Sequence, residues 1–383
     1  MSAPASLWQI WVIFTRLGLT SFGGPSAHVA YFHDEFVTQR KWLTEHEFAQ
    51  DNALCQIVPG PASSQLGMLI GARQQGLWGS LVAWLGFTMP SALVMLAVMW
   101  GSHWLSAYPT LTQGLLLAAA CAVTHAIWSM ARVFCQTRTT QLITVACTIV
   151  PLLWAVPWIQ FACICGAATL SAFLIQQTTP VATPVSIISK RTSIVLLTLF
   201  GVLCVASLLI ASPLSMLYQT GALVFGGGHV MLPLLQARLV NAGYLTTVAL
   251  LQGYASVQIV PGPLFSIGAY VGGITMGGNI GAALAGLIVI FLPGWLLIMG
   301  VMPWWSAIQA HPRVQHGFVG IQAAVVGILA ATLIDPIIPA AIHSNSDIVI
   351  WMLGVTVLLV VRWPAWIATL MVVLVSVVVG VLE

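Results

Sequence analysis

Long apolar runs make up most of the chain, and short stretches between them hold almost all the charged residues. No Asp, Glu, Lys or Arg lies between Arg73 and Arg132, or between Arg238 and Arg313. A membrane-spanning helix needs about 20 mostly apolar residues, so the second of these windows alone has room for three. The runs do not alternate between apolar and polar positions, as the strands of a transmembrane barrel do. The pattern therefore predicts an all-α, polytopic membrane protein with about 10–13 membrane segments.

Composition leaves few other classes of protein open. Of the 383 residues, 59% are hydrophobic and 5% are charged, whereas about 25% of the residues of a soluble domain are charged. A soluble fold of this size needs a far larger charged surface, so soluble enzymes and nucleic-acid-binding proteins are almost excluded. The formal net charge of +3 is too small to indicate a polyanionic partner. The lipid bilayer is the partner that composition implies.

The chain contains an internal repeat. The hexapeptide Gln56–Pro61 (QIVPGP) recurs unchanged at Gln258–Pro263, 202 residues further on. The triplet Phe22–Gly24 recurs as Phe225–Gly227, and a histidine follows each copy. Agreement among so many uncommon residues indicates two homologous halves. We place these halves at residues 1–178 and 193–383, joined by a polar linker with two prolines at residues 179–192.

The basic residues bear on how the two halves are oriented. Half one has Arg40, Lys41 and Arg73 near its repeated motifs, whereas half two has Arg238 alone in the matching stretch. Inverted repeats place matching loops on opposite faces of the membrane, and cytoplasmic loops carry the excess of Lys and Arg. Parallel repeats would have more even counts. The asymmetry favours inverted topology, with the first set of loops in the cytoplasm.

Each Pro-Gly-Pro segment is expected to end one helix and begin another. Proline disfavours helical geometry in the residue before it and is well placed in a first helical turn. A break of this kind at membrane depth persists only against protein or a watery cavity. The new helix N-terminus offers free N–H groups to an anion, and two such ends across a pseudo-twofold axis would make one site at the midplane. The alternative is a kink used only for packing. The candidate substrate-binding residues are Gln56, Pro59, Gly60, Pro61, Ala62 and Ser63 in half one, and Gln258, Pro261, Gly262, Pro263 and Ser266 in half two.

The glycine clusters are a second candidate element. Consecutive glycines permit positive φ angles and close approach of the backbone, and a nest of N–H groups also binds anions. The alternative is a helix C-cap followed by a tight turn. The candidate residues are Phe22, Gly23, Gly24 and Pro25 in half one, and Phe225, Gly226, Gly227 and Gly228 in half two.

Three ionisable residues near these motifs are candidates for the same site. Arg16 lies in the first apolar run, and a cation at membrane depth is a functional candidate unless it reaches the interface instead. His28 and His229 follow the glycines in both halves and can donate to an anion or carry a proton. A structural role at a helix start is the alternative for both. By contrast, Tyr31 to Asp51 holds five of the eight acidic residues, and we interpret it as a solvated helix on the membrane surface.

No motif indicates an enzyme. The chain lacks HExxH, GxSxG and P-loop sequences, and no paired carboxylates lie in an apolar segment. We therefore expect no catalytic residues, no metal site and no cofactor. Because no nucleotide-binding motif is present, any transport must be secondary or passive.

Taken in order, these motifs resemble one known family. FGG with its histidine, Trp42-Leu43, QxxPGP and GxxxxGxxG occur in half one, and FGGG, PGP, GxxxxGxxG and Phe291–Gly294 occur in half two. This series resembles the CHR chromate ion transporter family over residues 10–335. The sequence departs from the family pattern at Cys55-Gln56 and at Tyr254–Ser256. The resemblance implies efflux of chromate across a bacterial inner membrane, chromate resistance and antiparallel halves, with sulfate as the natural competitor.

Electrostatics favours the same direction. Moving one elementary charge through 100 mV is worth about 2.3 kcal/mol, so a dianion leaving an inside-negative cell gains about 4.6 kcal/mol. Export needs no coupled ion, whereas import would need cotransported cations. The alternatives are a permease for sulfate or another tetrahedral oxyanion, and a membrane receptor or scaffold that binds the anion without moving it. A homodimer also stays open.

Overall fold

The computed structural model describes residues 4–105, 107–154, 156, 158–174, 187–225, 227–309 and 311–382. Within these ranges the chain forms helices and no strand, as predicted. Six of the described helices are long and apolar enough to cross a membrane, and four shorter apolar helices accompany them. The proposed linker at 179–192 lies mostly outside the described residues, because the description stops at 174 and resumes at 187.

The helices of half one are α1 (Leu7–Thr20), α2 (Gly24–His33), α3 (Glu45–Ile57), α4 (Ala62–Leu105), α5 (Pro109–Phe134), α6 (Arg138–Leu153) and α7 (Ile159–Leu174). A connecting helix, α8 (Lys190–Leu209), leads to half two. The helices of half two are α9 (Pro213–Leu223), α10 (Met231–Leu235), α11 (Thr247–Ile259), α12 (Ile267–Thr275), α13 (Ile280–Val301), α14 (Trp305–Gln309), α15 (Pro312–Thr332), α16 (Ile338–Ala341), α17 (Asn345–Thr356) and α18 (Ala365–Leu382). Short 3-10 or π turns link several of them: Asp34–Gln39, Gly228–Val230, Gln236–Val240, Leu264–Ser266, Met302–Trp304, Leu333–Ile337 and Val357–Val361.

Each half begins with a helical hairpin whose tip is the glycine cluster. In half one, α1 and α2 run antiparallel, since the Phe14 ring packs on Phe32 and Phe36 at centroid distances of 5.8 and 5.1 Å. On the same two arms, Arg16 pairs with Glu35. The corresponding residues of half two, Gln219 and Arg238, also bond to each other. The same two positions therefore hold the arms of both hairpins together, with different side chains.

A second hairpin follows in each half, and its tip is the Pro-Gly-Pro loop. In half one, Arg73 of α4 donates to both carboxylate oxygens of Asp51 in α3, at 2.7 and 2.9 Å. Because Asp51 precedes the loop and Arg73 follows it, the chain enters and returns on the same side. In half two, Tyr270 of α12 lies against Gly253 of α11, the counterpart of Asp51, where an added Cβ would come within 2.5 Å of the Tyr270 ring. Both hairpins are therefore re-entrant.

The GxxxxGxxG motif makes the next turn. At Gln75 and Gly76 the backbone leaves helical geometry, with φ +59° at Gly76, and α4 folds back on itself. The two arms touch at Gly71 and Gly79, where a Cβ on Gly71 would lie 2.3 Å from the Gly79 carbonyl oxygen. In half two, α12 turns at Gly277-Gly278 before α13. The three glycines of the motif thus permit a turn and a backbone-to-backbone contact that a side chain would block.

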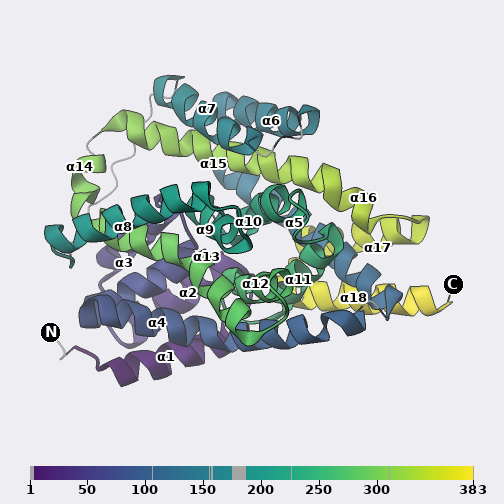
Figure 1. Cartoon of the computed structure of the whole chain (residues 1–383), viewed down its shortest axis with the longest axis horizontal. Helices are drawn as coiled ribbons and strands as arrows, with labels where there is room; N and C mark the ends of the chain where they lie inside the picture. The colour runs from purple at the N-terminus through teal and green to yellow at the C-terminus, as the bar shows by residue number, and fades with distance from the viewer. Residues whose placement is uncertain are drawn as a thin grey trace.

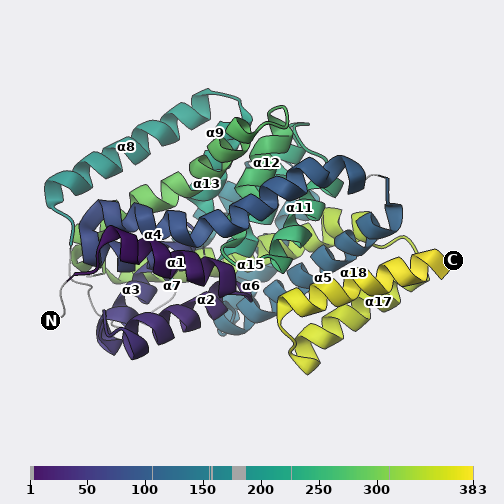
Figure 2. The same ribbon diagram turned by 90° about the horizontal axis from the view of Figure 1, so that it is seen from below.

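The two halves exchange helices. Helix α5 of half one packs along α17 and α18 of half two, and α15 of half two packs along α6 and α7 of half one. Figure 1 shows α6 and α7 beside α15 at the top of the molecule, and Figure 2 shows α18 beside α5. Neither half therefore has a complete core of its own.

The arrangement of the two halves favours the inverted repeats predicted from the sequence. The hairpins of half one lie towards the left of Figures 1 and 2, near the N-terminus, and α11 and α12 lie to the right of them. In Figure 2, helix α8 runs from left to right along one side of the molecule. The first helix of half two, α9, therefore starts further to the right than α1, the first helix of half one. Our division assigns α8 to half two from residue 193, and this boundary stays a prediction.

The interpretation of Tyr31–Asp51 as one solvated surface helix is wrong. The segment runs from α2 into a π turn, bends at residues 40–44, and continues as α3. Glu35 and Asp51 are 4% and 0% exposed. Each carboxylate is buried because an arginine pairs with it: Arg40 Nε lies 2.6 Å from Glu35, and Arg73 holds Asp51. Glu35 and Asp51 therefore hold the hairpins together, whereas Asp34 and Glu45 are exposed.

This arrangement predicts a specific pattern of stability. Replacing Arg73→Met leaves the Asp51 carboxylate buried without a partner, which is expected to cost about 3–5 kcal/mol. Replacing both residues, as Asp51→Leu with Arg73→Met, removes the charge and is expected to restore most of the loss. Thermal unfolding of the purified variants in detergent measures both. Equal stability of the single variant and the parent would contradict a role for this ion pair in holding the hairpin.

Candidate transport site

The four hairpin tips meet in the middle of the molecule. The Gly60 N–H of the first Pro-Gly-Pro loop donates to the Val224 carbonyl of half two at 2.8 Å. The Gly262 N–H of the second loop donates to the Ser21 carbonyl of half one at 3.0 Å. Val224 and Ser21 each immediately precede the glycine cluster of their half. Each proline tip thus bonds to the glycine tip of the opposite half, and the two bonds are related by the repeat.

Glycine is required at both proline tips. Gly60 and Gly262 have φ angles of +135° and +102°, which side chains rarely adopt. An added Cβ on Gly60 would also lie 2.9 Å from the Cα of Gly294 in α13. On Gly262 it would lie 3.0 Å from the Ser91 hydroxyl in α4. The second arm of α4 and its counterpart α13 therefore back the two loops.

The tip of half one carries the polar groups. Ser63, Ser64 and Gln65 stand in the first turn of α4 and are at most 4% exposed. The Gln65 amide nitrogen donates to the carbonyls of Pro59 (2.8 Å) and Gly294 (3.0 Å), which closes the loop. The Ser64 hydroxyl has no hydrogen-bond partner in the described part of the chain, and the same holds for the hydroxyls of Ser21 and Thr88. An unpaired buried polar group costs about 1–3 kcal/mol, so a ligand or a water molecule that reaches these hydroxyls would supply the partner they lack.

His28 connects the two tips of half one. Its Nε2 lies 3.2 Å from the Ser21 carbonyl oxygen, and its Nδ1 lies 3.2 Å from the Ser63 hydroxyl. A carbonyl only accepts, so Nε2 carries the proton and Nδ1 accepts from Ser63. His28 is 1% exposed, and the Phe87 ring packs edge-on against it. In this arrangement both ring nitrogens of His28 are engaged, and the ring orients Ser21 and Ser63.

The tip of half two is more apolar. Leu264 and Phe265 stand where half one has Ala62 and Ser63, and the Ser266 hydroxyl donates to the Pro263 carbonyl at 2.8 Å. His229 Nδ1 lies 2.6 Å from the Tyr254 hydroxyl and 3.5 Å from the Gln258 amide nitrogen. The two histidines thus have different partners, and most donors at the tips belong to half one.

The glycine tips leave space beside the loops. Gly24 and Gly227 have φ angles of +78° and +138°, and an added Cβ on either would meet no atom within 4 Å. Gly23, at φ +106°, is exposed, and Pro25 lies in the first turn of α2. The Phe22 ring packs on Trp366 of α18 at 5.1 Å.

The counterparts in half two are more enclosed. Phe225 is partly buried, Pro261 is half-buried, and a Cβ on Gly228 would lie 2.9 Å from Leu264. Gly226 lies outside the described residues.

Two sequence candidates do not join the others through their side chains. Arg16 pairs with Glu35 inside the first hairpin, and its side chain is 55% exposed. The Gln56 backbone carbonyl accepts from Gln322 of α15 at 3.3 Å. Both remain predictions as ligands.

Several residues that contact the tips do not stand out in the sequence. Ser21, Ser91 and Gly294 were not among the candidates. A signal was present, because Pro90-Ser91 and Pro293-Gly294 occupy matching positions in the two halves. Among the described residues, no group of three or more His, Cys, Asp or Glu is placed to hold a metal ion.

Comparison with known proteins agrees with the resemblance seen in the motifs. The family profile described as chromate transporter matches residues 8–172 and 211–381. The chain belongs to the chromate transporter family. The two matched regions are the two repeats, and α8 lies between them. The protein is therefore a multi-pass membrane protein of a transporter family.

Several curated proteins are similar to this chain along most of their length. The chromate transport protein of Pseudomonas aeruginosa is 27% identical over 355 residues, which cover 87% of this chain and 81% of that protein. The probable chromate transport protein of Synechococcus elongatus is 26% identical over 345 residues, 86% of this chain and 84% of that protein. The chromate transport protein of Cupriavidus metallidurans is 24% identical over 363 residues, 87% and 83% respectively. No solved structure matches the chain significantly.

The packing of the tips predicts the effect of adding one methyl group. Gly60→Ala introduces both an unfavourable φ angle and a contact with Gly294, so it is expected to destabilise the protein by about 2–5 kcal/mol. Gly166→Ala in α7 is the matched control, because a Cβ there meets no atom within 4 Å. Thermal unfolding in detergent compares the two. If Gly60→Ala unfolds at the temperature of Gly166→Ala, the loops do not pack as described.

Proposed function

We propose that this protein is a secondary transporter that moves chromate across the membrane and binds it between the four hairpin tips. The observation that carries the proposal is the convergence of the tips. The first turns of α2 and α4, and of the short helices that begin at Gly228 and Leu264, all start at the tips. A helix N-terminus presents free N–H groups and the positive end of the helix dipole, both of which attract an anion. The unpaired hydroxyls of Ser21 and Ser64 add donors at the same place.

These donors are neutral, which suits a site that binds an anion and then releases it. The described groups at the tips are backbone amides, hydroxyls, Gln side chains and the buried His28 and His229, and Arg16 is engaged with Glu35. A path must bind an ion well enough for entry and weakly enough for release. Neutral donors meet this requirement for a dianion, whereas an arginine clamp would hold it tightly. The same donors fit any tetrahedral dianion, so sulfate is the expected competitor.

The basic residues support an orientation for the protein. Arg40, Lys41 and Arg73 lie at the base of the half-one hairpins, and the second arm of α4 runs from there to Leu105 at the other end. Helix α5 returns over 26 residues, about 39 Å, and brings Arg132 and Arg138 back to the first end. Helix α13 also runs to this end, where Lys190 lies 5.4 Å from the Trp304 ring and Arg313 follows. Arg238 lies at the opposite end, since neighbouring Gln236 bonds to Thr247 at the start of α11.

This distribution supports export. The positive-inside rule places the end with Arg40, Lys41, Arg132, Arg138 and Lys190 in the cytoplasm. A dianion that moves from there to the opposite face of an inside-negative membrane gains about 4.6 kcal/mol per 100 mV. Export of chromate therefore requires no coupled ion, and in a bacterial inner membrane it would confer chromate resistance.

Chromate flux into everted membrane vesicles tests the proposal. Wild-type protein under an inside-positive potential should accumulate chromate, and excess sulfate should slow the uptake. Ser64→Ala removes one donor to a charged ligand, which is worth about 1.5–3 kcal/mol, and should raise the chromate concentration at half-maximal flux by about tenfold or more. The change should not lower stability, because the Ser64 hydroxyl has no partner to lose.

The matched control is Ser171→Ala in α7, whose buried hydroxyl already bonds to the Ala168 carbonyl at 3.2 Å. It should leave the flux as in the parent. Wild-type vesicles that bind chromate without accumulating it at any potential would favour the receptor or scaffold alternative. Flux that Ser64→Ala leaves unchanged would place the anion path elsewhere.

A further inference from the structure

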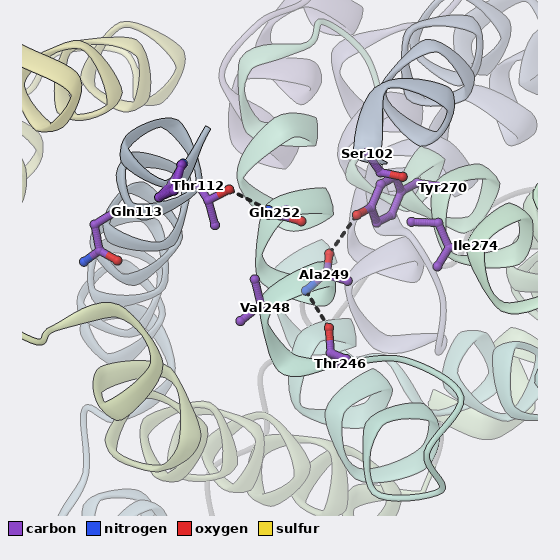
Figure 3. Close-up of a pocket in the computed structure, with 10 residues that line it drawn as sticks. Ser102, Thr112, Gln113, Thr246, Val248, Ala249, Gln252, Tyr270 and Ile274 are labelled. Atoms are coloured by element: carbon purple, nitrogen blue, oxygen red, sulfur yellow. Dashed lines mark hydrogen bonds between the residues drawn. The ribbon is translucent and has the colours of Figure 1, made fainter. Parts of the chain in front are cut away.

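A polar cavity opens at the end of the molecule opposite to most basic residues. It has a volume of about 590 Å³, within the range of about 300–1,000 Å³ that small-molecule sites occupy. Figure 3 shows its walls, which come from the end of α4, the start of α5, the start of α11, and α12. We call this cavity the vestibule. Its lining includes the polar side chains of Ser102, Thr112, Gln113, Thr246, Gln252 and Tyr270.

The vestibule is suited to an anion. Among the described residues, its lining carries hydroxyl and amide groups and no Asp, Glu, Lys or Arg. Helix α5 begins there at Pro109, and its N-cap residue Tyr108 makes no side-chain hydrogen bond to the first turn. The amides of this turn and the dipole of a 26-residue helix therefore face the region that Thr112 and Gln113 line. In Figure 3, Gln252 donates to the Thr112 hydroxyl at 3.1 Å across the gap between α11 and α5.

One carboxylate lies close by, and its charge is already engaged. A neighbouring cavity of about 290 Å³ shares Pro109 and Gln113 with the vestibule and is also lined by Asp347. Asp347 accepts from the backbone N–H groups of His343 and Ser344, both at 2.9 Å. These donors offset its negative charge, so it repels an anion in the vestibule less than a free carboxylate would.

The vestibule also lies near one of the tips. Gln252 is in α11, and the second Pro-Gly-Pro loop follows the end of this helix. Nine residues at 1.5 Å each separate the two by about 14 Å. Between them, the Ser256 hydroxyl bonds to the Gln252 carbonyl, and Gln258 bonds to His229. The vestibule and the tip of half two are therefore about three helical turns apart along α11.

The corresponding place in half one is different. The residues that correspond to Thr246, Ala249, Gln252 and Tyr270 are Thr44, Glu47, Gln50 and Met68. Glu47 accepts from the Thr44 hydroxyl at 2.9 Å, and Gln50 bonds to His46 at 2.8 Å. The carboxylate of Glu47 thus stands near the start of α3 in half one, at the place where the vestibule has Ala249. The two ends of the molecule are not equivalent for an anion.

We infer that the vestibule is a second, weaker oxyanion site on the path, at which a tetrahedral dianion released from the tips stops before it reaches the outer solution. Thr112, Gln252 and the first turn of α5 hold it there. The inference rests on the proposed function, because it needs an oxyanion that arrives from the tips. It goes beyond that function by assigning a separate site and its ligands at the outer face.

Side-specific kinetics tests this inference. The double variant Thr112→Val with Gln252→Leu keeps the shape of both side chains but removes their donors. Chromate flux is measured in right-side-out vesicles, where the vestibule faces the added chromate, and in everted vesicles, where it does not. The half-saturating chromate concentration should rise about tenfold from the vestibule side and stay within about twofold from the other side. Gln50→Leu, the matched change in half one, should not raise it from the vestibule side.

The outcomes separate the two proposals. Absence of flux in wild-type vesicles of both orientations would overturn the proposed function. Normal wild-type flux with a double variant that changes half-saturation equally on both sides, or on neither, would overturn the vestibule site alone.

Thiol labelling answers the same question if the double variant does not reach the membrane. Val248→Cys places a thiol on the vestibule wall, and His46→Cys is its counterpart in half one. A membrane-impermeant thiol reagent should modify Val248→Cys from the outer face and His46→Cys only from the inner face. Molybdate, a tetrahedral dianion that does not oxidise thiols, should slow the first reaction. Modification of Val248→Cys only from the inner face, or a rate that molybdate does not change, would contradict the inference.

Discussion

Two backbone hydrogen bonds, from Gly60 to Val224 and from Gly262 to Ser21, hold the centre of this molecule together. Each joins the proline tip of one half to the glycine tip of the other. In a membrane interior an unpaired backbone group costs several kcal/mol, so a broken helix at this depth needs such a partner. The repeat supplies this partner, because the N–H at each proline tip donates to the carbonyl just before the glycine cluster of the other half. The four tips can therefore exist only as a set.

The repeat is symmetric in its backbone and asymmetric in its chemistry. Both halves have two hairpins and a turn at matching glycines, yet half one joins its hairpin arms with ion pairs and half two with Tyr270 against Gly253. The same division appears at the tips, where half one provides Ser63, Ser64 and Gln65 and half two provides Leu264 and Phe265. A path that has to release its ion on one chosen side needs two different ends. Divergence of the side chains on a common backbone provides them.

Most of the architecture could be predicted because glycine and proline restrict the backbone locally. The helix breaks at Phe22–Gly24 and Pro59–Pro61 follow from the φ angles that these residues permit. The number of basic residues in matching loops was enough to favour inverted repeats. The partners at the tips could not be predicted, because the acceptors at Val224 and Ser21 are carbonyls, which every residue has. Pairing of α5 with α18 was also out of reach, since it depends on contacts such as Gly114 against Val373, far apart in the sequence.

The most direct test of this account is to locate a bound oxyanion. Selenate is a tetrahedral dianion whose selenium scatters anomalously, so crystals of the protein grown with selenate would show its position. The account predicts an anomalous peak within hydrogen-bonding distance of Ser64 and the first turn of α4, between the two Pro-Gly-Pro loops. A strong peak at another place in the membrane interior, with the region between the tips empty, would contradict it.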